Sequence, residues 1–273
     1  MMRKVVDTNF LQSEALREYL AASYENYVVV PDYVAMEAYK GDTLNQIYDR
    51  MKILSSYSKQ VIVLKGTEEI CGLSGRAAES QTLLIDESQT RSFPEYCQHL
   101  LAAKRGDASL RQQLLEHGSV ATTHIDSMLC DMKTLADGID LMAKTYLAAE
   151  LKILRRHEKP TPQMQEKLMQ RVCQLAQLSH AQHRSVMKWP KGPEVRDTFI
   201  FRYALCGYLS ILKRIENGTT QNVKPDKLRN DVVDINVVAS ATYFDGLLTT
   251  DKKAGAIYAD AEFLLREAFP IPI

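Results

Sequence analysis

The sequence lacks an excess of charge of either sign and lacks any long apolar run. Its 273 residues include 34 basic and 34 acidic side chains, a balance that counts against broad binding of nucleic acid duplexes, although a local basic groove stays compatible with it. No run of about 18 apolar residues occurs, and the start, MMRKVVD, lacks the apolar stretch of a signal peptide. We therefore expect a cytoplasmic protein with no membrane partner.

Cysteine chemistry is also sparse. The five cysteines are scattered, and none forms a Cys-x-x-Cys motif, which indicates reduced, packed thiols rather than a disulfide framework. His180 and His183 have a spacing that suits a zinc site, but no fourth ligand motif accompanies them, so we interpret them as solvated helix residues. With 45% hydrophobic and 25% charged residues, the chain has the composition of an ordinary globular protein.

Two acidic residues near the start of the chain follow predicted strands. Asp7 comes directly after the apolar run 4–6, and the chain then turns into a helix expected over 10–22. Glu37 lies on a predicted helix that follows a second apolar run, 28–30. Open α/β sheets place ligands at the carboxyl ends of their strands, so we expect both side chains at one edge of a sheet.

Two further acidic residues lie near the other end of the chain. A helix expected over 228–244 carries Asp234, and Asp231 lies one turn earlier on the same face. Residues 246–250 are a predicted strand, and Asp251 follows it. Because an unpaired carboxylate on an apolar helix is costly, Asp234 in particular indicates a functional site.

Clustered carboxylates repel one another unless a cation lies between them. Mg²⁺ and Mn²⁺ prefer oxygen ligands, so they are the ions that such a cluster suits. We therefore predict that one or two of these ions bind to Asp7, Glu37, Asp234 and Asp251. Asp231 is either a fifth ligand or a residue that orients one. The alternative for Asp7 and Asp251 is that each only caps the helix after it.

The order of these residues resembles the PIN family of metal-dependent nucleases. The matching motifs are VVDTN at the start, MEAYKG around Glu37, and D-x-x-x-x-A-x-A followed by LLTTD. Asp234 and Asp251 are 251 − 234 = 17 positions apart, the spacing associated with the last two acidic residues of that family. The resemblance covers roughly residues 1–64 and 224–268.

The resemblance implies an α/β fold, with a three-layer α/β/α core around a mostly parallel sheet. It also implies that the four acidic residues are catalytic metal ligands, with Thr8 or Asn9 as a polar helper toward the substrate. Arg202, on the helix before the acidic pair, and Lys224 are our candidates for contacts with phosphate.

The chain is about twice as long as an ordinary PIN domain. We predict that residues 1–66 and 196–273 form the nuclease core and that 67–195 form a helical insertion. Within the insertion, long helices over 125–156 and 163–187 are expected to form a hairpin that turns at Pro-Thr-Pro. The insertion is expected to shape the cleft or to bind a protein partner or inhibitor, and homo-oligomerisation is left open.

Three functions are compatible with the sequence. The expected one is a Mg²⁺- or Mn²⁺-dependent endoribonuclease that cleaves single-stranded RNA, as a toxin, a defence effector or an RNA-processing enzyme; the choice of RNA rests on the resemblance alone. The second is a catalytically weak PIN-like scaffold that binds a protein or RNA through its insertion. The third is a structure-specific DNA nuclease, which would favour a more basic surface and Gly-rich helix–hairpin–helix turns that the sequence lacks.

Overall fold

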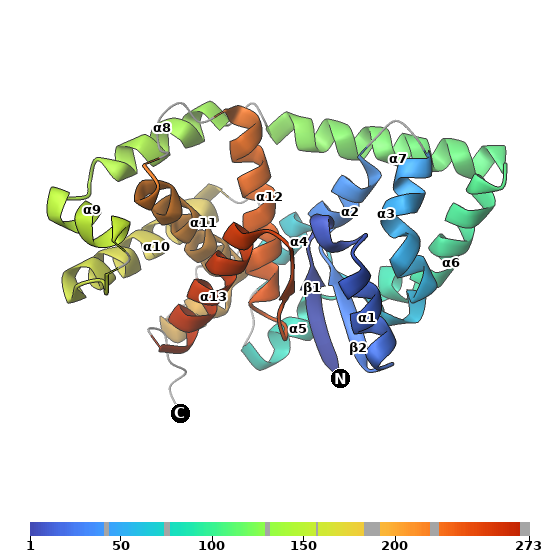
Figure 1. Ribbon diagram of the computed structural model, residues 1–273, viewed down its shortest axis with the longest axis horizontal. Helices are drawn as coiled ribbons and strands as arrows, with labels where there is room; N and C mark the ends of the chain where they lie inside the picture. Colours follow the sequence, from blue (N-terminus) through green and yellow to red (C-terminus); the bar gives the residue numbers. More distant parts are fainter. Residues whose placement is uncertain are drawn as a thin grey trace.

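Helices make up most of the protein, and one small parallel sheet organises its first and last segments (Figure 1). The computed structural model describes residues 1–40, 44–73, 77–128, 132–156, 158–182, 192–218 and 224–267. The mostly helical chain with an all-parallel sheet is compatible with the expected α/β class. In these described ranges, no helix has the length and apolar character needed to cross a membrane.

The sheet brings the two ends of the chain together. Its strands are β1 (Met2–Val6), β2 (Asn26–Val30), β3 (Val61–Val63) and β4 (Leu247–Leu248), in the order β3-β2-β1-β4. The valine-rich runs of β1 and β2 end in fully buried residues, as expected for parallel strands covered on both faces. All four strands run the same way, so their carboxyl ends lie at one edge.

A turn at Asp245 and Gly246 aligns the last strand with the first. The Arg3 amide donates to the Asp245 carboxylate at 2.6 Å, and the Asp245 amide donates to the Arg3 carbonyl at 2.8 Å. Gly246 has a φ of 153°, a conformation that residues with a Cβ rarely adopt. Its carbonyl accepts from the Val5 amide at 2.9 Å, which sets the register of β4.

The helices occupy most of the remaining chain. They are η1 (Thr8–Phe10), α1 (Glu14–Ala22), α2 (Asp32–Tyr39), α3 (Leu44–Ser56), η2 (Ser58–Gln60), α4 (Thr67–Cys71), α5 (Ala77–Leu84), α6 (Glu87–Lys104), α7 (Ala108–Ser127), α8 (Met132–Ala143), α9 (Ala148–Arg155), α10 (Pro162–Gln182), η4 (Gly192–Asp197), α11 (Phe199–Glu216), α12 (Pro225–Ala241) and α13 (Lys252–Glu267).

The prediction of one helix over 10–22 was wrong in its first turn. The chain forms the short η1 first, and α1 begins only at Glu14. Ser13 causes this later start, because its hydroxyl accepts a hydrogen bond from the Leu16 amide at 3.1 Å and so caps α1. The result keeps Thr8 and Asn9 in a tight turn directly after β1.

The prediction of one long helix over 125–156 was also wrong. Three helices, α7, α8 and α9, share this stretch. Between α8 and α9, the Thr145 hydroxyl donates to the Met142 carbonyl at 2.7 Å, and the Leu147 amide donates to the Glu150 carboxylate at 2.7 Å. These bonds satisfy the exposed ends of both helices, while the apolar spacing continues because α8 and α9 still pack on α12 and α11.

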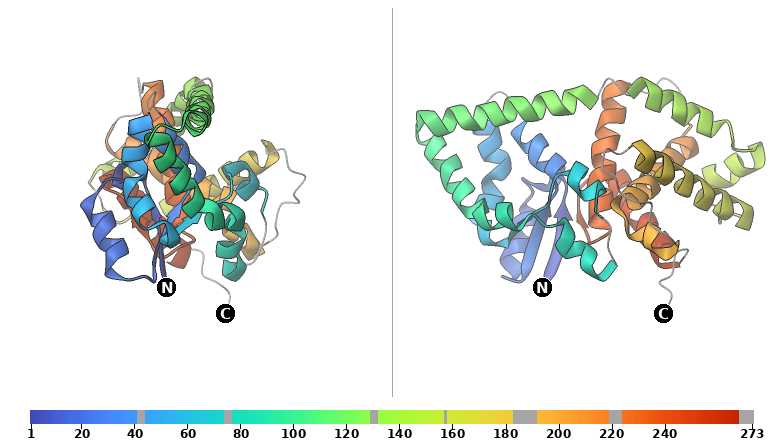
Figure 2. Two further views of the ribbon diagram at one scale, coloured as in Figure 1. Left: turned by 90° about the vertical axis from the view of Figure 1, so that its right-hand side faces the viewer. Right: turned by 180° about the vertical axis from the view of Figure 1, so that it is seen from behind.

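Five helices of the expected insertion lie in two groups, while α4, α5 and η4 belong to neither. Helices α6 and α7 pack against α3 and α2, beside the β3 end of the sheet. Helices α8, α9 and α10 pack against α12 and α11, on the other side of the molecule (Figures 1 and 2). The second group therefore borders the segment that carries Asp231 and Asp234, whereas the first group supports the helix that carries Glu37.

One partly buried chain of polar side chains connects α2 and α12, against which these two groups of helices pack. The Thr67 hydroxyl donates to the Asp32 carboxylate at 2.8 Å, and the Thr67 amide donates to the same group at 2.6 Å. The Asn236 side-chain amide in turn donates to the Thr67 hydroxyl at 2.8 Å. Asp32 starts α2 and Asn236 lies on α12, so Thr67 links the helices that position Glu37 and Asp234.

Replacing Thr67 with valine should destabilise the protein by about 1–3 kcal/mol, because the buried Asn236 amide loses its acceptor while the volume hardly changes. The midpoint of urea unfolding measures this. Thr122→Val is the matched control, since that hydroxyl bonds only to a carbonyl of its own helix; its effect should stay within about 0.5 kcal/mol. Equal effects of the two substitutions would contradict the proposed link.

Candidate active site

Segments from both ends of the chain surround a cavity of about 590 Å³ at the carboxyl edge of the sheet. Asp7 enters it from the end of β1, Glu37 from α2, Asp234 from α12, and Asp251 from the turn after β4. Thr8, Asn9 and Asp231 line it as well. The structure therefore brings together seven of the nine residues that the sequence analysis selected.

Asp7 is the most enclosed of these carboxylates, with 5% of its surface exposed. Its Oδ2 atom accepts hydrogen bonds from the Asn9 side-chain amide at 2.6 Å and from the Thr249 hydroxyl at 2.7 Å. Burial raises the pKa of Asp7, and the nearby charge of Asp251 adds to the increase, while the hydrogen bond from Thr249 opposes it. Asp7 ends β1 without a side-chain cap on η1, so the capping alternative does not describe it.

Glu37 is held by the turn that follows Asp7. The Thr8 hydroxyl donates to Glu37 Oε2 at 2.6 Å, which joins the end of β1 to α2. The Arg50 guanidinium donates to the Glu37 carbonyl at 2.7 Å and so fixes the last turn of α2. Thr8 thus acts on a carboxylate of the site.

Asp251 has two roles. Its Oδ1 atom accepts from the amides of Lys253 and Ala254 at 2.6 and 2.9 Å, which caps α13. It also lines the cavity. The cap fixes the position of the carboxylate.

Asp231 is already paired with two cations of the cavity wall. It forms a salt bridge with Arg214 of α11, and Lys253 of α13 donates to its Oδ1 atom at 2.7 Å. These contacts hold three helices together around the cavity. They favour the interpretation of Asp231 as a residue that positions its neighbours over that of a fifth metal ligand.

Among these carboxylates, Asp234 has the pKa that is shifted furthest from its ordinary value. Its pKa is raised to about 7, first because the side chain is buried and then because Asp7, Asp251, Asp231 and Glu37 place negative charge nearby. Asp231 lies on the same helix as Asp234, and the other three neighbours come from β1, α2 and the turn after β4. This shift is the electrostatic consequence of gathering carboxylates at one sheet edge.

Four cations line the same cavity, and the sequence analysis missed them. They are Lys213, Arg214, Lys227 and Lys253. Lys227 precedes Asp231 by four positions on one helix, a spacing that could have indicated a shared face. Nothing in the sequence indicated that α11 ends at this cavity, so Lys213 and Arg214 carried no signal. Thr249 was missed too, although it lies in the TTD motif directly after β4.

Arg202 and Lys224 do not line the cavity, so the structure does not bring them to the other candidate residues. Arg202 donates to the Thr242 hydroxyl at 3.2 Å and lies over the Tyr243 ring at 3.7 Å, so it holds the end of α12. It lies near the start of α11, about 18 Å along the axis from the end that meets the cavity. Lys224 is exposed at the start of α12, more than two turns before Asp234.

The donor set of the cavity fits Mg²⁺ or Mn²⁺ in chemistry, because carboxylate and amide oxygens dominate it. Within the described ranges, however, no three His, Cys, Asp or Glu side chains already stand in an arrangement that could hold a metal ion. The hydrogen bonds of Asp7, Glu37 and Asp251 and the mutual repulsion of the carboxylates account for this separation. A bound cation would have to draw these side chains inward.

The comparisons with known proteins add no relative. No family model, no curated protein and no solved structure matches the chain. The geometry of the cavity therefore carries the functional argument.

The pKa of Asp234 predicts a pH dependence of stability. The folded-state pKa, about 7, lies above the ordinary value of 3.8, so the folded protein binds an extra proton between these values. The stabilisation from this group is full below pH 3.8 and is lost as the pH rises through 7. Without divalent ions, Asp234→Asn should therefore match the parent near pH 4 and melt at a higher temperature at pH 8.

Thermal melts of the parent and the variant from pH 4 to 8 test this. Asp245→Asn, at the opposite end of β1 from the cavity, is the control and should keep the pH dependence of the parent. If Asp234→Asn ran parallel to the parent over the whole range, the carboxylate cluster would not control the charge of Asp234.

Proposed function

We propose that the protein is a Mg²⁺- or Mn²⁺-dependent endonuclease that cleaves single-stranded RNA and has a PIN-like α/β/α core. The observation that carries the proposal is a single cavity in which clustered carboxylates face a row of cations. Phosphodiester hydrolysis needs both, because a metal must be held and an anionic backbone must be positioned.

The acidic side of the cavity would hold the metal. Asp7, Glu37, Asp234 and Asp251 supply oxygen ligands from four separate elements. A bound divalent cation supplies a more acidic water and neutralises charge on the phosphate. It would also lower the pKa of Asp234, so that this group is ionised at neutral pH.

Polar side chains of the sheet edge would set the direction of the carboxylates. Asn9 and Thr249 hold one oxygen of Asp7, and Thr8 holds one oxygen of Glu37. Such bonds restrict the side-chain rotation that would otherwise misplace a ligand. This role makes Thr8 and Asn9 positioning residues of the acidic side rather than direct contacts of the substrate.

The basic side of the cavity would hold the phosphate backbone. Lys227 is exposed at the rim, and no described residue forms a salt bridge with it, so its charge is available to an incoming phosphate. Lys253 donates to Asp231 and, with three N–H donors on its ammonium group, can also bind a second anion. Together they place negative phosphate beside a metal site that is itself negative.

The substrate class follows from the limited extent of the basic wall. A chain with no net charge and only a local row of cations suits a flexible single strand better than a duplex. Asn217 and Asn230 line the same wall and offer amides that can bond to a ribose 2′-hydroxyl. These two residues support RNA over DNA.

A scaffold with little catalysis is the second candidate. It is favoured by one observation, namely that the described carboxylates are not yet arranged as a metal site. The metal-binding and cleavage experiments below separate the two candidates.

Divalent ions should bind to the purified protein and stabilise it. Mn²⁺ or Mg²⁺ at about ten times its dissociation constant should add about 1.4 kcal/mol to the free energy of unfolding at neutral pH. Asp234→Asn should weaken binding by at least about tenfold, whereas Asp245→Asn should bind as the parent does. Titration calorimetry and thermal melts measure both. Absence of binding at millimolar ion would exclude the metal site.

Cleavage should depend on Asp234 and not on Asp245. With Mn²⁺ and one labelled single-stranded RNA, Asp234→Asn should lose at least about 100-fold in rate, because the metal loses a charged ligand. Asp245→Asn keeps an oxygen that can accept from the Arg3 amide and should cleave as the parent does. Comparable activity of the two variants, with metal binding retained, would favour the scaffold.

A further inference from the structure

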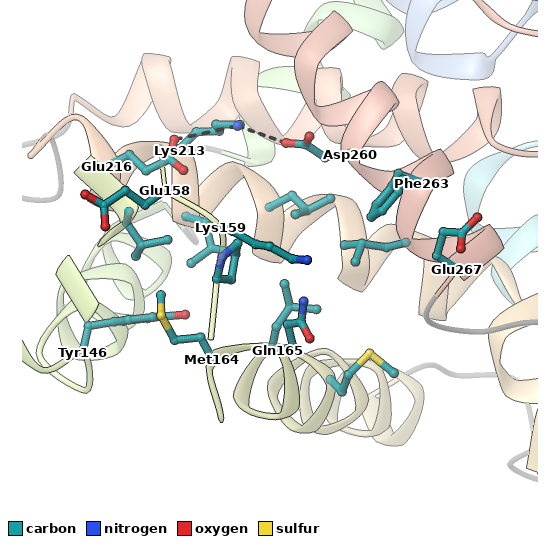
Figure 3. Close-up of a pocket in the computed structure, with 17 residues that line it drawn as sticks. Tyr146, Glu158, Lys159, Met164, Gln165, Lys213, Glu216, Asp260, Phe263 and Glu267 are labelled. Atoms are coloured by element: carbon teal, nitrogen blue, oxygen red, sulfur yellow. Dashed lines mark ion pairs between the residues drawn. The ribbon is translucent and has the colours of Figure 1, made fainter. Parts of the chain in front are cut away.

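A second cavity, of about 680 Å³, lies beside the candidate active site and shares helices α11 and α13 with it (Figure 3). It runs between α10, α11 and α13, and the end of α9 and the turn before α10 close one side of it. Apolar side chains line most of it. Figure 3 shows Glu158, Glu216 and Glu267 at its rim and the Lys159 side chain extending into it. We call it the three-helix groove.

The last helix presents one complete stripe to the groove. Asp260, Phe263, Leu264 and Glu267 of α13 line it at positions i, i+3, i+4 and i+7. This is the spacing by which one face of a helix contacts a neighbouring helix. Phe263 is 64% exposed, so the described residues leave a large aromatic side chain on this stripe mostly uncovered.

The facing helix repeats the same pattern. Leu209, Leu212, Lys213 and Glu216 of α11 line the groove, again at i, i+3, i+4 and i+7. Helix α10 contributes Met164, Leu168 and others at helical spacing. Three helix faces with this spacing around one apolar channel form the wall against which a further helix packs.

The charges at the rim indicate what kind of helix fits. The groove is lined by four acidic residues, Glu158, Glu216, Asp260 and Glu267, and by two basic residues, Lys159 and Lys213. Lys213 is already engaged by Asp260 at 3.0 Å and by Glu216 at 3.8 Å, and Arg156 pairs with Glu158 at 3.7 Å. Among the described residues, the four carboxylates still outnumber the three cations. This net negative charge disfavours phosphate-rich ligands and anionic lipid, and it complements lysine or arginine.

We propose that the three-helix groove binds an amphipathic helix of a partner protein, apolar on one face and basic on its flanks. The apolar face would cover Phe263 and the floor of the groove, and the flanking cations would lie against the acidic rim. This inference does not rest on nuclease activity, although Lys213 lines both the groove and the candidate active site.

Three synthetic peptides of about 18 residues, long enough for five helical turns, test the proposal. The first has leucine at i, i+3, i+4 and i+7 repeats with lysine on both flanks. The second replaces lysine with glutamate, and the third shuffles the first so that its apolar face is lost. Fluorescence anisotropy with the full chain should show that the first binds at least about tenfold more tightly than the others.

Variants of the protein assign the binding to the groove. Phe263→Glu should weaken binding of the lysine peptide by at least about tenfold. Tyr24→Glu changes an aromatic residue that is 83% exposed and lies outside the groove, so it should leave the affinity unchanged. Glu267→Lys, at the exposed rim, should weaken the lysine peptide and strengthen the glutamate peptide. Circular dichroism checks that each variant is folded.

Three results would overturn the proposal. They are equal binding of the lysine peptide and its shuffled form, equal affinity in Phe263→Glu and Tyr24→Glu, and sedimentation of the free protein as a dimer that Phe263→Glu disrupts. The last result would mean that a second copy of the chain covers the groove.

Discussion

The pairing of β1 with β4 is the constraint on which the candidate site depends. Val5 pairs with Leu247 and Val6 with Leu248, so residues 242 positions apart in the chain become neighbours. Only because of this register can the Thr249 hydroxyl reach Asp7 and the Asn9 side-chain oxygen Oδ1 accept from the Thr250 amide at 3.0 Å. Without β4 the carboxyl edge would lack both Thr249 and Asp251, and the cavity would be open on that side.

The gathered carboxylates create a cost that the rest of the cavity offsets. Asp231 is neutralised by Arg214 and Lys253, Asp251 is held by helix amides, and Asp234 remains as the group whose pKa rises to about 7. Neighbouring cations and amides thus stabilise Asp231 and Asp251 more than Asp234. The repulsion among the carboxylates therefore acts mainly on Asp234 and raises its pKa. A site that only stabilised the fold would place its charges farther apart, since a buried carboxylate without a partner destabilises.

The sequence predicted the strands and the acidic edge because both depend on local patterns. Val28 to Val30 form an apolar run, and Asp7 directly follows another, so strand ends could be located without knowing the neighbours. Arg202 and the cations of α11 could not be assigned in this way. Which end of α11 meets the cavity is fixed by how α10 and α12 pack on it, and one turn of misplacement changes which basic residue faces a substrate.

The breaks between helices in the expected insertion were likewise not predictable from local sequence patterns. They also explain how its helices are arranged. Hydrogen bonds at Thr145 and Glu150 divide one apolar pattern into separate helices, which lets α8 follow α12 while α9 follows α11. A single straight helix could not bury both stripes. This division leaves α10 and α13 on either side of α11 with a channel between them. The same packing that fixes Lys213 and Arg214 at the cavity therefore produces the three-helix groove on the adjoining face of α11, with Lys213 lining both.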